Sequence, residues 1–217
     1  MNTPTPLRLD DLVNPLWRYA LALYGRPGVA PSCLVLQRSL GVDVCLLIYA
    51  LYACQERLRL SADSLAQADH DLEVWRNQVV LPLRKIRETM KAGVKGIAFE
   101  HSDWVREQIK ATEVNAEQVA LAYLNTQISC LPHNLTAPNR MNAAIQETVH
   151  RVLNHFAHRH HELSAALRNP EVSVAAETIA TEAYNLQQHG PDPEAVRLPH
   201  QDAPHGPPEE RKTNPQR

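Results

Sequence analysis

Four cationic side chains on one expected helix are the strongest candidates for chemistry in this sequence. Arg76, Arg84, Arg87 and Lys91 fall within roughly 80° of one another on a helical wheel and flank the apolar stripe of that helix. A guanidinium there can make two parallel hydrogen bonds to a phosphate or a carboxylate. We therefore predict an anion site or the docking site of an acidic partner, centred on Arg84 and Arg87. The competing interpretation is that these side chains pack on the core and pair with nearby carboxylates such as Glu73.

A run of histidines is the second candidate. His155, His158 and Glu162 share one flank of a later helix, and three- or four-residue spacing is the geometry that a helix offers to Zn²⁺. The sequence has no HExxH motif and no paired cysteines. The competing interpretation is a solvated polar face with one packed histidine, and neighbouring histidines could also give a pH response.

The remaining residues do not point to a reaction. No serine, cysteine or threonine lies in a recognisable nucleophile setting, and no cofactor motif is found, so we expect no cofactor. The adjacent acids Asp10 and Asp11 have no second acidic motif with which to hold Mg²⁺. These observations favour a non-enzymatic protein that binds another protein or regulates it, and they leave homo-oligomerisation open.

Two alternative functions use the same cationic helix. One is a small-anion binder or an all-helical enzyme acting through Arg76, Arg84, Arg87 and Lys91. The other is a nucleic-acid-associated protein, which the overall charge disfavours. Lys and Arg number 22, Asp and Glu number 24, and the formal net charge is −2, so no global field attracts nucleic acid.

The elements that must position these residues are helices. Apolar residues recur at helical spacing along most of the chain, and no strand-turn-strand pattern is present. Pro82 interrupts the cationic helix and predicts a kink or break near 79–81, because proline lacks a donor and crowds the preceding turn. The expected fold is all-α, an irregular bundle of six or seven helices. The helices are expected at about 15–25, 31–41, 44–59, 61–93, 102–129, 139–167 and 171–188.

The most apolar run, Val44 to Cys54, predicts the central helix of the bundle. It is apolar on every side, and Asp43 precedes it as the expected N-cap. At 11 residues it is well short of the ~20 needed to cross a bilayer, so we expect no membrane span. The N-terminus lacks the pattern of a secretory signal. We therefore expect a cytoplasmic protein whose four cysteines are reduced and buried, namely Cys33, Cys45, Cys54 and Cys130.

Composition divides the chain into three parts. Residues 1–11 are expected to be a flexible N-terminus and residues 12–190 a helical domain. Seven of the 27 residues in 191–217 are proline and none is aromatic, so this segment is expected to be a disordered Pro-rich tail.

Two blocks of sequence carry a family resemblance. The first, residues 16–55, contains Trp17, Tyr24, Pro27-Gly28-Val29 and Gly41-Val42-Asp43-Val44; the second is WRNQVVLPLRKIRETMK at 75–91. Together they resemble a bacterial family of conserved hypothetical proteins, a domain of unknown function, over roughly residues 13–130. The resemblance implies a cytoplasmic helical protein and transfers no established activity.

Overall fold

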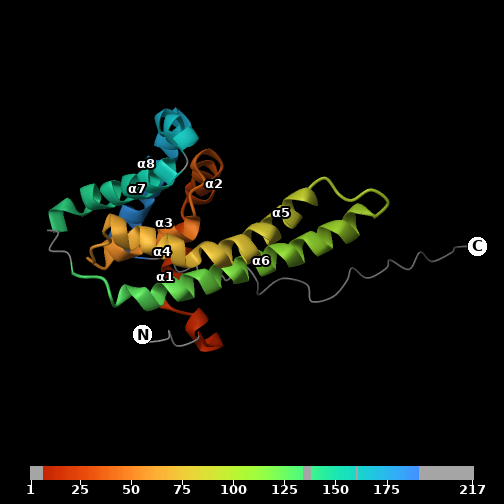
Figure 1. Cartoon of the computed structure of the whole chain (residues 1–217), viewed down its shortest axis with the longest axis horizontal. Coiled ribbons are helices and arrows are strands. Elements are labelled where there is room, and N and C mark those ends of the chain that lie inside the picture. The colour runs from red at the N-terminus through yellow and green to blue at the C-terminus, as the bar shows by residue number, and fades with distance from the viewer. Residues whose placement is uncertain (1–6, 134–137, 160, 191–217) are drawn as a thin grey trace, which may run out of the picture. The chain divides into compact units, whose positions relative to one another are not determined.

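The computed structural model describes residues 7–133, 138–159 and 161–190, which form helices joined by short turns and loops (Figure 1). The expected tail, 191–217, lies outside the described residues. No strand forms in the described part, where the only β feature is an isolated bridge between Leu58 and His133. The all-α prediction is confirmed. The α-helices are α1 (Pro15–Tyr24), α2 (Val29–Leu40), α3 (Val44–Gln55), α4 (Ala62–Trp75), α5 (Leu81–Thr89), α6 (Phe99–Ile128), α7 (Met141–Arg159) and α8 (Pro170–His189).

The described helices divide into two compact units. Of the described residues, the first contains 7–74 and those from 118 to 190, and therefore holds α1 to α3, most of α4, the end of α6, α7 and α8. The second, Trp75–Glu117, contains α5 and the first part of α6, which run back along each other as a helical hairpin. Each unit is described separately below.

Helix α3 lies at the centre of the first unit, as its composition predicts. Residues 45–51 and Ala53 are all buried. The helix begins where expected, because the Asp43 carboxylate accepts a hydrogen bond from the Leu46 amide at 3.2 Å. Helices α1 and α7 pack against α3, and α8 packs against α2 and α7.

Helix α3 ends at Gln55, four residues before the expected end at Arg59. The Leu58 amide donates to the Ala53 carbonyl at 2.8 Å and the Arg57 amide to the Cys54 carbonyl at 3.0 Å. This pair of hydrogen bonds is a Schellman motif, and it requires a left-handed residue, here Arg57 with φ of 55°. The chain then turns away, and the Arg59 amide donates to the Pro132 carbonyl at 2.7 Å.

The irregularity predicted before Pro82 is a π-helical turn. Residues Arg76–Val80 form it between α4 and α5, and the Leu81 amide reaches back to the Arg76 carbonyl. Proline cannot donate to the preceding turn and its ring crowds that turn, so a widened turn accommodates it without ending the helix. Because the π turn joins α4 directly to α5 along the chain, the described residues contain seven separate α-helical segments if these two are counted as one, within the predicted six or seven.

The long helix expected over 139–167 is two elements. Helix α7 ends at Arg159, and a 3₁₀ segment follows over His161–Arg168. Residues 158–161 are all histidine or arginine, and histidine is a weak helix former. Helix α8 then starts at Pro170, capped by Asn169. The apolar stripe of α7 comprises Met141, Ile145, Val149, Val152 and Phe156, all buried.

Within the described residues, no single helix is both long and apolar enough to span a membrane. Only α2 and α3 taken together meet that criterion, and they are bent by 119° relative to each other. The expectation that all four cysteines are buried is confirmed for Cys33 and Cys45. It is wrong for Cys54, which is half-buried, and for Cys130, which is exposed just after α6.

The left-handed Arg57 yields a stability prediction. A non-glycine residue in this conformation is strained, so Arg57→Gly is expected to raise the free energy of unfolding by about 0.5–1 kcal/mol, after allowing for the added freedom of the unfolded chain. Urea denaturation followed by circular dichroism measures the change. The control is Arg38→Gly in the last turn of α2, which is expected to destabilise by about 1 kcal/mol. A loss of stability in Arg57→Gly would contradict the assigned backbone conformation.

Candidate functional site

The hairpin places two of the four predicted cationic residues around one buried carboxylate. Arg84 Nε lies 2.7 Å from Glu113 Oε1, and Arg87 Nε lies 2.5 Å from Glu113 Oε2. Arg84 Nη2 lies 2.6 Å from Glu117 Oε1. The Glu113 side chain is only 7 % exposed, so α5 and α6 are joined by ion pairs with little access to water.

The ion pairs keep Glu113 ionised in spite of its burial. Burial is the largest single effect and acts to raise the pKa of this carboxyl. Hydrogen bonds from Arg87 and Arg84, together with their charges, outweigh burial and hold the pKa of Glu113 below its usual value. The hydrogen bond to Glu113 also raises the pKa of Arg87. Arg84 and Arg87 therefore pair with carboxylates of α6. This agrees with the competing interpretation, in which these arginines pair with carboxylates of the protein itself.

The other two predicted cations are placed differently. Arg76 lies in the π turn, and this turn breaks the α-helical phase on which the wheel grouping depended. Lys91 is exposed just after α5, which ends at Thr89. Of the four predicted cations, the structure therefore brings only Arg84 and Arg87 to one carboxylate. Lys91 lies beyond the end of α5.

The histidine run meets a buried aspartate in the first unit. Asp69 on α4 is 2 % exposed, and its Oδ2 lies 2.8 Å from His155 Nε2. Because a carboxylate only accepts, Nε2 carries the proton in this contact. Arg159 also pairs with Asp69 and, at 2.5 Å, with Glu73. These contacts join α4 to α7 and fix the orientation of the His155 ring.

The predicted metal ligands are only partly described. His158 donates from Nδ1 to the Asn154 carbonyl at 2.6 Å, whereas His155 is held by Asp69. The Glu162 side chain lies outside the described residues. Among the side chains that are described, no group of three or more metal-ligating residues is assembled.

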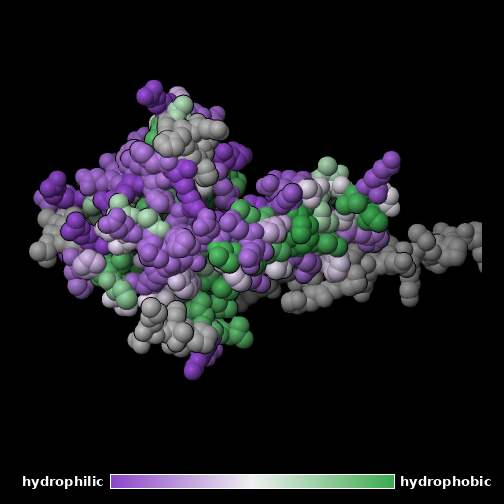
Figure 2. Space-filling model, in the orientation of Figure 1, coloured by the Kyte–Doolittle hydropathy of each residue, from purple (hydrophilic) through white to green (hydrophobic). Residues whose placement is uncertain are grey.

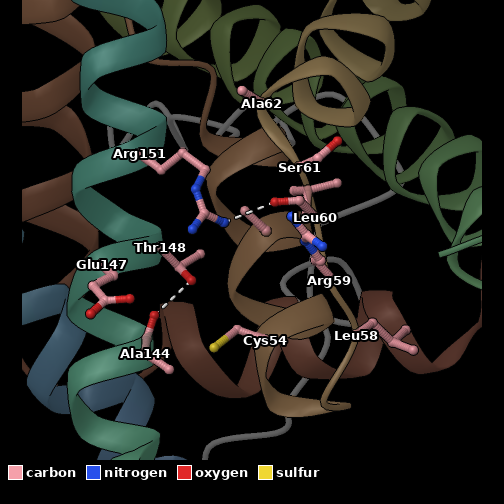
Figure 3. Close-up of a pocket in the computed structure, with 11 residues that line it drawn as sticks. Cys54, Leu58, Arg59, Leu60, Ser61, Ala62, Ala144, Glu147, Thr148 and Arg151 are labelled. Carbon is pink, nitrogen blue, oxygen red and sulfur yellow. Dashed lines mark hydrogen bonds between the residues drawn. The ribbon is translucent and has the colours of Figure 1, made fainter. Parts of the chain in front are cut away.

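A cavity of about 380 Å³, which no sequence pattern predicts, lies beside α7 (Figure 3). Its walls are the end of α3, the connecting segment 58–61, the start of α4 and one side of α7. Arg151 reaches from α7 across to the opposite wall, where its Nη1 donates to the Leu60 carbonyl at 2.8 Å. Arg59 enters from that opposite wall, so both guanidinium groups lie beside Leu60. Burial raises the pKa of the Cys54 thiol in the cavity, which keeps it protonated.

A second cavity, of about 540 Å³, continues along α7. It shares Ala62, Glu147 and Arg151 with the first, and we call the two together the α7 groove. The second cavity also contains His150, Leu65, Asn154, His155 and His158.

Sequence reasoning noticed the histidines but missed the arginines of this groove. Arg59 and Arg151 come from elements about 90 residues apart, so no local spacing links them. The available signal was weak: Arg151 lies four residues before His155, on the same side of an expected helix.

Comparison with known proteins finds one match. The sequence family described as "Protein of unknown function (DUF2390)" matches residues 15–124, which includes α1 to α5 and most of α6. No curated protein and no solved structure matches the chain.

The buried carboxylate yields a prediction with a pH signature. Glu113→Gln removes the charge that Arg87 pairs with and leaves Arg84 paired with Glu117, so the local opening free energy of α5 and α6 is expected to fall by about 3 kcal/mol at pH 7. Because the folded pKa of Glu113 is below its ordinary value of 4.5, its contribution is present above pH 4.5 and is lost as the pH falls through the folded pKa. The difference between wild type and variant is therefore expected to shrink in acid.

Hydrogen exchange of the α5 and α6 amides measures this local free energy at each pH. The matched control is Glu107→Gln on the same helix, where an exposed carboxylate pairs with Arg106 and Lys110, and a change of under about 1 kcal/mol is expected. Equal effects of the two substitutions, or a Glu113→Gln deficit that persists at low pH, would contradict the role assigned to Glu113.

Proposed function

The chain belongs to the DUF2390 family, and we propose that it is a non-enzymatic, cytoplasmic interaction protein that docks an acidic partner protein on the tip of its helical hairpin. The observation that carries the proposal is the distribution of polarity in the second unit. This hairpin buries one carboxylate, Glu113, between two arginines and exposes several apolar side chains near its turn.

The exposed apolar side chains gather where the hairpin turns. Val94, Ile97 and Phe99 are 43, 55 and 60 % exposed. Leu81, Ile86 and Val105 add further exposed apolar surface on the two helices. Figure 2 shows hydrophobic surface gathered over α5 and the beginning of α6. An exposed apolar cluster of this kind marks an interaction site more often than a solvent-facing surface.

The middle of the hairpin is joined by charge. Glu113, with Arg84 and Arg87, lies between α5 and α6. An ion pair of this kind orients two helices at little net gain in stability, since desolvation offsets much of the attraction. Nearer the turn, Ile97 and Phe99 are exposed and available for another surface to cover.

Charge near the tip indicates the chemistry of the partner. Lys85, Lys91 and Lys95 are exposed and lie beside the apolar residues in sequence. Exposed Glu88 and Glu100 are interspersed with them, an arrangement that fits a folded acidic protein better than a uniformly anionic membrane. We infer a partner with an apolar patch bordered mainly by carboxylates.

The alternative that the arginines hold a free anion is less well supported. Arg84 and Arg87 are already paired with Glu113, and a ligand would have to displace a buried carboxylate from them. The whole hairpin lies within residues 15–124, the region that matches the family.

The proposal predicts a contact at one place on the hairpin. A photo-crosslinking amino acid in place of Phe99 is expected to trap one acidic protein in the native host, whereas the same group in place of Val174 on α8, which is 63 % exposed, is not. With that protein purified, Ile97→Ser and Phe99→Ser are each expected to weaken binding by about tenfold or more, the effect of losing about 1.5–3 kcal/mol of apolar burial. Isothermal titration calorimetry measures this.

Two further measurements accompany this experiment. Circular dichroism is expected to show unchanged folding, because both side chains are exposed. Lys91→Glu with Lys95→Glu is expected to slow association with an acidic partner. Cross-linking at Phe99 to a second copy of the chain, sedimentation with anionic vesicles, or equal trapping at Phe99 and Val174 would each contradict the proposal.

A further inference from the structure

The α7 groove is a cationic concavity that the proposed hairpin function does not use. Its lining includes two arginines, Arg59 and Arg151, and three histidines, but a single carboxylate, Glu147. The excess of cationic groups lies on two walls that face each other, in the first unit of the chain.

Both guanidinium groups retain capacity for a ligand. In the part of the chain that the structure describes, the side chain of Arg151 makes one hydrogen bond, to the Leu60 carbonyl, and a guanidinium carries five donors. The Arg59 side chain is exposed and makes no side-chain hydrogen bond among those residues. The two charges match a phosphate monoester, which carries about −1.5 to −2 at pH 7.

The remainder of the groove suits the organic part of such a molecule. Ala50, Leu58 and Leu60 line the first cavity, and Leu65 lines the second. The two adjoining volumes, about 380 and 540 Å³, are in the range of small-molecule sites, roughly 300–1,000 Å³. His155, held by Asp69, presents a fixed ring at the far end.

The arginine-bearing wall is held in place before any ligand arrives. Arg57 adopts a left-handed conformation at the turn that leads into it, and the Arg59 amide is bonded to Pro132. Arg151 ties the Leu60 carbonyl to α7. A wall that is preorganised in this way lowers the entropic cost of binding.

We propose that the α7 groove binds a phosphorylated small molecule. Its phosphate is held between Arg59 and Arg151, and its organic part lies on the apolar floor toward Leu65. This inference is independent of the hairpin, which belongs to the other unit.

The test is calorimetric titration of the full chain at constant ionic strength with three probes: phenyl phosphate, inorganic phosphate and benzoate. Phenyl phosphate is expected to bind most tightly, because it uses both the guanidiniums and the apolar floor. Inorganic phosphate is expected to bind more weakly, and benzoate more weakly still. The double variant Arg59→Gln with Arg151→Gln is expected to weaken the binding of phenyl phosphate and of inorganic phosphate by about tenfold or more, since it removes charge-assisted hydrogen bonds.

A matched control removes the same charge elsewhere. Arg18 on α1 and Arg38 on α2 are exposed, so Arg18→Gln with Arg38→Gln is expected to leave all three affinities unchanged. Ala62 is exposed and lines both cavities, so Ala62→Trp is expected to abolish the preference for phenyl phosphate over inorganic phosphate.

Each contrary result overturns the proposal. These results are no saturable binding of either phosphate, equal binding of benzoate, or an arginine double variant that binds as tightly as the wild type. Should that double variant fail to fold, Arg59→Gln alone decides, because the exposed Arg59 side chain holds no other group in the described residues. Unchanged phosphate affinity in this single variant also rejects the assignment.

Discussion

An α-helix without a polar side must be enclosed by other helices, and α3 imposes this requirement on the first unit. Its residues 45–51 are all buried, so neighbours are needed around its whole circumference. Helices α1 and α7 supply part of that cover, and α8 packs in turn on α7 and α2. At the edge of this core Tyr19 and Tyr52 are in ring contact at 5.4 Å, and burial raises the pKa of the Tyr19 hydroxyl.

Because α3 is apolar on every side, polar side chains of this region lie beyond its C-terminal end. Once α3 stops at Gln55, the chain turns through Arg57 and leaves a hollow between the connecting segment and α7. Helix α7 therefore has two unlike sides: an apolar stripe that belongs to the core, and a side with Arg151 and His155 that lines the groove. Asp69 connects the second side to α4, because its buried charge needs His155 and Arg159 as partners.

In the second unit a buried ion pair, and not an apolar helix, lies at the contact between helices. A hairpin of two helices has too little apolar interior to specify one arrangement by burial alone, and here Glu113 sets the pairing of α5 with α6. The π turn before Pro82 lets the chain continue into α5 without a break. Apolar side chains such as Ile97 and Phe99 then remain exposed, so the unit is suited to binding another surface.

Local signals in the sequence located most of the helices, although the expected ends of α3 and α7 were too late. Asn14, Asp43 and Asn169 cap helices as their types predict, Pro82 marks the irregular turn, and the all-apolar run at 44–54 identifies the central helix. These features depend on backbone donors and on spacing within a few residues, which a single sequence displays directly. The predicted end of α3 was wrong because the residue that ends the helix in a left-handed conformation is Arg57. Glycine usually occupies that position, so the sequence did not indicate a helix end there.

The partners of the charged residues were decided only by tertiary structure. The sequence showed that Arg84 and Arg87 share one flank of a helix, but whether they faced a ligand or a carboxylate depended on Glu113, 26 residues or more away. The α7 groove likewise joins Arg59 to Arg151 across about 90 residues. Helical periodicity determines which side of a helix a residue occupies, whereas the groups that meet that side are set by the packing of distant helices, for which a single sequence has no local signature.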